Sequence, residues 1–165
     1  MDVFNTIGIF VVEQVRNNII ISRQVVRNAI VDVGKNSLLD TMFDDTAKAT
    51  WYSGLISSLT TLSVADTMAS HTGWIEFTNY DEAVRQEWVV EAARTVQKSI
   101  RNDADHLMTF TINDSTSPVL KGIMIADSST KSGTTGTLWS TAPLTTNITL
   151  DNNDVIRIKY IVTIN

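Results

Sequence analysis

Apolar and polar residues alternate over many short segments of the chain, which is the pattern of half-buried β-strands. Ile, Val and Thr are frequent in these segments, and their β-branched side chains pack well on a pleated sheet. Turn-forming residues separate the segments at intervals of about 8–12 residues, as in a β-sandwich or barrel. We predict strands at residues 7–14, 19–26, 51–56, 74–80, 96–100, 107–112, 119–126, 137–140, 147–150 and 155–164.

The first two predicted strands are joined by Asn17 and Asn18. Asn tolerates a positive φ angle, so this pair predicts a tight hairpin turn. Residues 19–21 form an unbroken Ile run, which indicates either burial on both faces of a sheet or a partner that covers one face. We expect residues 27–33 to continue the same sheet after a bend at Asn28.

Two segments favour short helices. Asn36 or Ser37 is a suitable N-cap for a helix of about two turns. Its expected apolar side consists of Leu38, Leu39, Met42 and Phe43. We expect residues 65–71 to form one helical turn. Residues 81–93 combine good helix formers with strand-like neighbours, so the pattern does not decide between helix and strand there. The pattern therefore predicts a mainly β antiparallel sandwich with one or two short helices.

The chain has 165 residues, which is the size of one domain. No internal repeat and no linker rich in Pro, Gly or Ser divides it, so we predict a single β-sandwich domain over residues 1–165. Residues 1–30 precede the predicted helix and are candidates for an N-terminal hairpin or arm used in assembly contacts. The apolar residues that we single out as candidate protein contacts, with a core strand as the equal alternative, are Val3, Phe4, Ile7, Ile9 and Phe10.

Charge and composition exclude several classes of partner. Thirteen Lys and Arg against eighteen Asp and Glu give a net charge of −5, so we expect no nucleic-acid partner, because that binding needs a basic face. A chain without cysteine has no disulfide, thiolate nucleophile or Cys-bound zinc. Its apolar runs are far shorter than the ~20 residues of a membrane span, and its first residues lack a signal-peptide pattern, so we expect no membrane partner.

Residue types used in catalysis and metal binding occur without the spacing that either chemistry requires. His71 and His106 belong to no His-x-His or His-x-x-x-His pair. The acidic turns at residues 103–105 and 151–154 lack the mid-loop Gly and bidentate Glu of a calcium loop. Residues 133–136 lack the Lys-Ser/Thr pair of a phosphate-binding loop. We therefore predict no catalytic, metal-binding or cofactor-binding residues and no enzyme activity.

Four tryptophans are candidates either for stacking on sugars or for packing in the core: Trp51, Trp74, Trp88 and Trp139. Trp51 and Trp74 lie in predicted strands, and we expect both in the core. Trp88 stands beside Glu87 and two valines, and it is our candidate anchor of a protein interface.

Several strings occur in a distinctive order along residues 30–165: VGKNSLLDTMF (33–43), WYSGLI (51–56), ADTMASHTGW (65–74), NYDEA (79–83), KGI (121–123) and SSTKSGTTGTLW (128–139). This order resembles a group of small structural proteins of tailed bacteriophages, which includes capsid cement or decoration proteins. The chain departs from that group after Ala83, where residues 84–96 replace a short turn that contains Pro or Gly. The resemblance specifies no contact residues.

The resemblance implies a jelly-roll-like sandwich that assembles on the outer surface of the capsid and ties neighbouring capsid subunits together. The expected partners are the major capsid protein and further copies of the chain, as a homodimer or, as the second choice, a homotrimer. The expected location is the virion, after synthesis in the cytoplasm of the host bacterium. The alternatives are a structural or glycan-binding protein of the phage tail or fibre and, as a third class, a hydrolase of host envelope polymers.

Overall fold

The computed structural model describes residues 6–93, 98–103 and 105–164. Within these residues the chain forms eleven strands and one helix. The strands build two antiparallel sheets, which we call sheet A and sheet B, and the two sheets enclose a shared core. The predicted mainly β sandwich is therefore confirmed, whereas its jelly-roll connectivity stays a prediction.

Sheet A is built around two long strands from opposite ends of the chain. Its strands are β1 (Thr6–Arg16), β2 (Ile19–Arg27), β7 (Ser99–Arg101), β8 (Met108–Thr111) and β11 (Val155–Ile164). β1 lies between β2 and β11, and β11 also pairs with β7 and β8. The described part of the predicted N-terminal arm is thus an inner strand and an edge strand of the sandwich.

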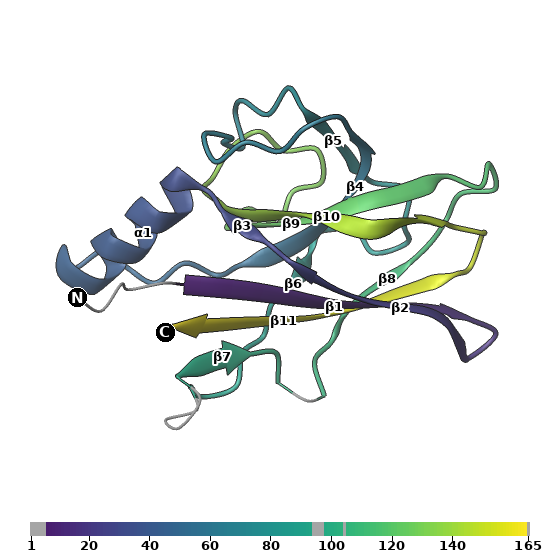
Figure 1. Cartoon of the computed structure of the whole chain (residues 1–165), viewed down its shortest axis with the longest axis horizontal. Coiled ribbons are helices and arrows are strands. Elements are labelled where there is room, and N and C mark those ends of the chain that lie inside the picture. Colours follow the sequence, from purple (N-terminus) through teal and green to yellow (C-terminus); the bar gives the residue numbers. More distant parts are fainter. Residues whose placement is uncertain (1–5, 94–97, 104, 165) are drawn as a thin grey trace.

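Sheet B has six strands in the order β3-β10-β9-β4-β5, with β6 also paired to β4. Its strands are β3 (Ala29–Ile30), β4 (Tyr52–Leu59), β5 (Trp74–Phe77), β6 (Gln86–Glu87), β9 (Val119–Ala126) and β10 (Leu138–Thr149). Figure 1 shows β9 and β10 of sheet B above β1 and β11 of sheet A. The one helix of the described residues, α1 (Asp32–Phe43), lies at the left end of the sandwich (Figure 1).

The turn predicted between β1 and β2 is confirmed. Asn17 and Asn18 have φ angles of 51° and 63°, as a two-residue hairpin turn with the right twist requires. A bulge follows where Val15 pairs with Ile20 and Gln14 with Ser22, which leaves Ile21 as the extra residue of β2. The resulting hairpin projects at the right end of the molecule in Figure 1.

The core between the sheets is centred on Tyr160. Its ring stacks on Phe10 with the ring centres 4.2 Å apart, and its hydroxyl accepts hydrogen bonds from Trp139 Nε1 at 2.8 Å and Asn28 Nδ2 at 2.6 Å. Complete burial raises the pKa of Tyr160 to about 12. The phenol therefore stays neutral and links the two sheets by hydrogen bonds as well as by packing.

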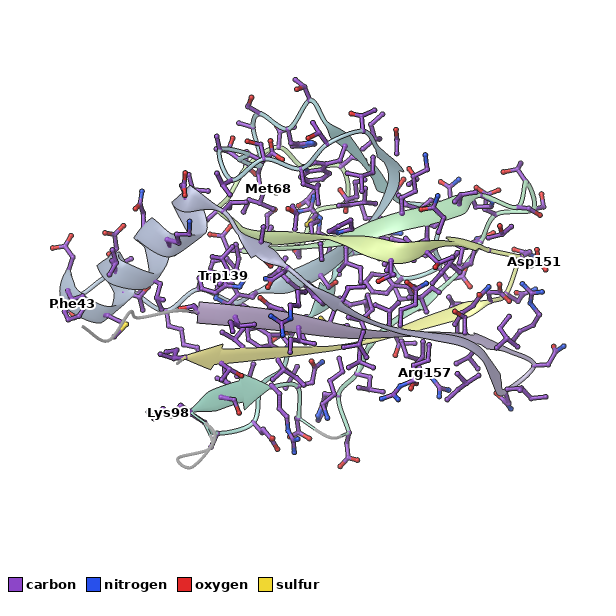
Figure 2. All side chains as sticks on the ribbon, in the orientation of Figure 1. Phe43, Met68, Lys98, Trp139, Asp151 and Arg157 are labelled. Carbon is purple, nitrogen blue, oxygen red and sulfur yellow. The ribbon has the colours of Figure 1, made fainter. Side chains whose placement is uncertain are left out.

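A second apolar cluster lies on the outer side of sheet B. The buried side chains of this cluster are Val31, Ile56, Met68, Trp74, Met124, Ala126 and Leu138. Residues 60–73, which join β4 to β5 and which we call the covering loop, place Met68 in this cluster with 1% of its surface exposed. Met68 lies beneath this loop at the top of Figure 2. The part of sheet B that contacts this cluster is therefore buried on both faces.

The unbroken Ile run at residues 19–21 was expected to be buried on both faces or covered by a partner. The prediction that both faces are buried within the chain is wrong, because the three side chains are 48–65% exposed on the edge strand β2. The apolar run at residues 123–126 is buried on both faces instead, since β9 lies inside sheet B. Gly122 in β9 allows a close backbone approach to β10, because a Cβ atom would lie 2.7 Å from the Ala142 carbonyl oxygen.

Residues 27–33 do not continue sheet A. The chain crosses at Asn28 to sheet B, where β3 pairs with β10, and α1 begins at Asp32, earlier than the predicted caps. Gly34 permits this start because a Cβ atom there would lie 2.5 Å from the Trp139 carbonyl oxygen. The predicted apolar side of the helix is mostly exposed, with only Leu38 packed against the core.

The helical turn predicted at residues 65–71 is wrong. The backbone amides of Thr67 and Ser70 each bond to the other residue's carbonyl oxygen, which closes a tight turn in the covering loop. The Asp66 carboxylate accepts hydrogen bonds from the Ser63 amide and from Trp74 Nε1, both at 3.1 Å. These contacts replace the regular hydrogen bonds of a helix, as short polar side chains often do.

Candidate binding surfaces

The outer surface of sheet A is the main candidate site. Strand alternation points Phe10, Val12 and Ile158 into the core, so the residues between them point outward. We call this surface the sheet A face, and it consists of Ile7, Ile9, Val11, Glu13, Arg23, Val25, Arg27, Arg157, Lys159 and Ile161. The covering loop packs on sheet B and α1 contacts β10, so neither lies over it.

Strand register arranges these side chains in rows across the face. Val11 lies between Val25 of β2 and Lys159 of β11. One row along, Ile9 lies between Arg27 and Ile161. Cations therefore flank an apolar centre, and the β1 side chains are half-buried by their neighbours while Val25 is 58% exposed.

The electrostatics of this face are dominated by positive charge. Glu13 lies between Arg23 and Arg157 in register, and it forms an ion pair with Arg23 at 3.3 Å. Arg101, across from Ile161, is paired with Glu91. Within the described residues, Arg27, Arg157 and Lys159 have no ion-pair partner.

A second candidate is an apolar pocket of about 410 Å³ beside α1, which we call the tryptophan pocket. Its aromatic walls are Trp51, Trp88 and Trp139, and the first and last of these have their ring centres 5.7 Å apart. The remaining lining residues are Thr6, Ser37, Leu38, Thr41, Lys48, Ala49, Thr50, Glu87, Val89, Val90, Ile100, Val162 and Ile164. The buried Trp88 indole N–H has no hydrogen-bond partner among the described residues.

The structure places the predicted contact residues in different parts of the sandwich. Ile7 and Ile9 lie half-buried on the sheet A face, whereas Phe10 is completely buried in the core on the opposite side of the same strand. Trp88 is half-buried as a wall of the tryptophan pocket, with its ring centre 4.9 Å from that of Tyr160, and its role as an interface anchor stays a prediction. Val3 and Phe4 lie outside the described residues.

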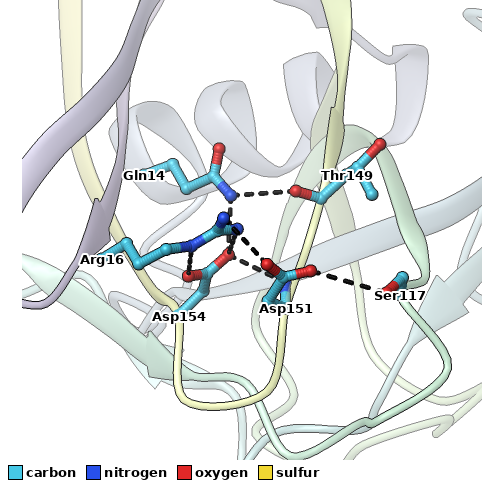
Figure 3. Close-up of polar contacts among 6 residues, drawn as sticks. All are labelled: Gln14, Arg16, Ser117, Thr149, Asp151 and Asp154. Carbon is cyan, nitrogen blue, oxygen red and sulfur yellow. Dashed lines mark hydrogen bonds and ion pairs between the residues drawn. The ribbon is translucent and has the colours of Figure 1, made fainter.

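A polar network fixes the hairpin end of sheet A (Figure 3). Asp154 is almost completely buried and accepts hydrogen bonds from Gln14 Nε2 at 2.7 Å, Arg16 Nε at 2.7 Å and the Asp151 amide at 2.8 Å. Burial alone would raise the pKa of Asp154, but these bonds outweigh it and hold the pKa below its ordinary value. The acidic turn at residues 151–154 therefore locks β1 to β11.

A buried ion pair was missed by the sequence analysis. Arg85 donates from Nε and Nη2 to the two carboxylate oxygens of Glu76, both at 2.8 Å, and from Nη1 to the Ser128 carbonyl oxygen. Both charged side chains are nearly inaccessible to solvent. Arg85 also donates from Nη2 to the Gly133 carbonyl oxygen, so the pair anchors residues 81–87 and the 128–136 loop to β5.

The histidines take part in local contacts. His71 stacks on Trp74 with the ring centres 3.7 Å apart, and His106 lies 3.6 Å from an Asp103 carboxylate oxygen. In the part of the chain that the structure describes, no three His, Asp or Glu side chains are grouped to hold a metal ion. No helix among those residues is long and apolar enough to cross a membrane.

Comparisons with protein-family models, with curated proteins and with solved structures found no match for this chain. Its function is therefore inferred from the geometry of these surfaces and from the sequence strings described above.

Four residues of the sheet A face were not predicted from the sequence: Val11, Val25, Arg157 and Lys159. Alternation within residues 155–164 puts Arg157 and Lys159 on the same side of the strand, and that pattern alone would have identified them. Their position beside β1 requires the pairing of two chain ends, which no local pattern shows.

Proposed function

We propose that the chain is a structural protein of a tailed bacteriophage particle. It attaches to the outer surface of the capsid and bridges neighbouring capsid subunits, as the sequence resemblance implies. The proposal gives the chain no catalytic role. Its partners are the major capsid protein and further copies of the chain.

The observation that carries this proposal is the contrast between a covered sheet B and an uncovered, partly apolar sheet A face. Exposed apolar patches of this kind are typical of protein contact sites. A sheet face is also rigid, so binding orders few side chains and loops and costs little conformational entropy. These features support a protein whose work is attachment to another protein surface.

The exposed edge strand β2 supports contacts between subunits. Ile19, Ile20 and Ile21 lie near the hairpin tip, and among the described strands β2 pairs only with β1. Free strand edges with apolar side chains readily pair with another chain. Many copies joined in this way around a shell would bind with high avidity even when each contact is weak.

The copy number of the protein in purified particles tests the proposal. Quantitative mass spectrometry measures the ratio of this protein to the major capsid protein. Hundreds of copies per particle are expected of a decoration protein. A handful of copies would move the protein to the tail or a vertex, and its absence from particles would overturn the proposal.

The tryptophan pocket favours a second candidate function, a tail or fibre protein that binds host glycans. Three indole rings in one pocket are suited to stacking on sugars. Most of the surface that lines the pocket is apolar, however, although six polar residues also contribute to it, and this balance favours the first proposal. Glycan binding that is lost on Trp88→Ala and retained on the exposed-site control Phe43→Ala would establish the second function.

A further inference from the structure

The chain is acidic overall, with a net charge of −5, but the sheet A face is cationic. Its cations, including Arg101 at the β7 edge, are Arg23, Arg27, Arg101, Arg157 and Lys159. The two carboxylates beside them, Glu13 and Glu91, are each paired with one arginine. Three cations therefore remain without an ion-pair partner on a face that no other helix or strand of the described residues covers.

We propose that the sheet A face binds an acidic protein surface, with carboxylates placed opposite Arg27, Arg157 and Lys159. This inference rests on the proposed function and specifies its partner, the outer surface of the capsid. Charge complementarity of this kind directs encounter and fixes the register of the two surfaces. The apolar side chains between the cations then supply the buried area.

The spacing of the cations constrains the partner. Arg157 and Lys159 are alternate residues of β11 on the same face, which sets their Cα atoms about 7 Å apart. Arg27 lies two strands away on β2, about 10 Å across the sheet. The partner should therefore present two carboxylates in a line and a third to one side, separated by apolar contacts.

Protein is a better partner than nucleic acid for this face. Val11, Val25 and Ile161 stand among the cations, and such aliphatic side chains contribute little to phosphate binding. An acidic protein surface with apolar side chains matches both properties of the face.

The test compares charge variants in binding to particles purified from a phage that lacks the gene for this protein. Arg157→Gln/Lys159→Gln removes the charges with little change in side-chain length, and Arg157→Glu/Lys159→Glu reverses them. The matched control Lys35→Gln/Lys121→Gln removes two charges from α1 and sheet B. Thermal unfolding and circular dichroism establish that each variant is folded.

We expect the neutral face variant to bind at least tenfold more weakly than the control, and wild-type binding to weaken as salt rises from about 50 to 300 mM. Equal binding by face and control variants, with wild-type protein bound, would overturn this inference and leave the proposed function standing. Wild-type protein that does not bind would overturn both. The inference also fails if wild-type protein binds a DNA duplex and the face variants lose that binding. It fails likewise if the face variants bind particles as wild type does and lose only self-association, measured by sedimentation.

Discussion

The two outer faces of the sandwich differ in whether other parts of the described chain cover them. On sheet B, the covering loop buries Met68 against Trp74 and Met124, and the Asp66 carboxylate holds the loop by bonding to Trp74. On sheet A, Val11 and Ile9 lie among cations, and no helix or strand in the described part of the chain lies over them. Figure 2 shows this opposition, with Met68 under the loop at the top and Arg157 on the far side of the molecule.

The difference separates stability from binding. Burial of side chains under the covering loop contributes to folding in every copy of the protein, whether or not a partner is present. Half-buried side chains on the sheet A face gain further burial only when another protein covers them. Substitutions on sheet B should therefore change the free energy of unfolding, and substitutions on the sheet A face should change binding.

The largest expected effect on stability comes from Met68→Ala. Removing this buried side chain leaves a cavity between the covering loop and sheet B, and we expect a loss of about 2–4 kcal/mol in the free energy of unfolding. The matched control Met42→Ala changes a side chain that is 53% exposed on α1 and should cost less than about 0.5 kcal/mol. Urea denaturation measures both, and equal losses would show that the loop does not bury a second core.

A smaller loss is expected from Asp154→Asn. The hairpin end of sheet A depends on the bonds that Asp154 accepts from Arg16 and Gln14. Replacing the carboxylate removes a charge-assisted interaction from a buried site, for a cost of about 2 kcal/mol. The exposed control Asp44→Asn should leave the denaturation midpoint unchanged. A midpoint that is the same in both variants would contradict the role of this network.

The same residue predicts a dependence on pH. The pKa of Asp154 is lower in the folded protein than in the unfolded chain, so its contribution is complete above the ordinary Asp pKa of about 4 and is lost as the pH falls through the lower, folded value. The stability difference between wild type and Asp154→Asn should thus be constant at neutral pH and shrink in acid. A difference that does not vary with pH would be evidence against the depressed pKa.

Val25→Thr should have the smallest effect on folding. The substitution keeps a β-branched side chain at an exposed position, so we expect the free energy of unfolding to change by less than about 0.5 kcal/mol. Particle binding should nevertheless weaken several-fold, because one methyl group that the partner would bury is replaced by a hydroxyl. Val31→Thr changes a buried residue of the second apolar cluster, at the start of α1, and should show the reverse pattern.

Local features of the sequence predicted the strands well. Residues 119–126 and 155–164 are strands with the predicted bounds, and the Asn17-Asn18 turn has the expected positive φ angles. Alternation and turn chemistry depend on neighbouring residues, so they are visible without a structure. The same alternation separates Ile9 from Phe10, which had been grouped as contact candidates although they point to opposite sides.

Features that depend on distant residues were not predictable. The apolar runs at residues 19–21 and 123–126 look alike, but one lies on a sheet edge and the other inside a covered sheet. Residues 65–71 of the covering loop were predicted to form a helical turn. The hydrogen bond from Trp74 Nε1 to the Asp66 carboxylate, which holds these residues in another conformation, follows from no local sequence pattern. The buried Arg85–Glu76 pair and the rows of the sheet A face likewise arise only from tertiary pairing.

The orientation of the protein on the particle tests the central claim most directly. A cryo-electron microscopy reconstruction of particles that carry the protein, at a resolution that separates the two sheets, would show which side meets the shell. We predict that β1, β2 and β11 face the capsid and that the covering loop faces solvent. A reconstruction with the covering loop against the capsid and the sheet A face in solvent would contradict this account.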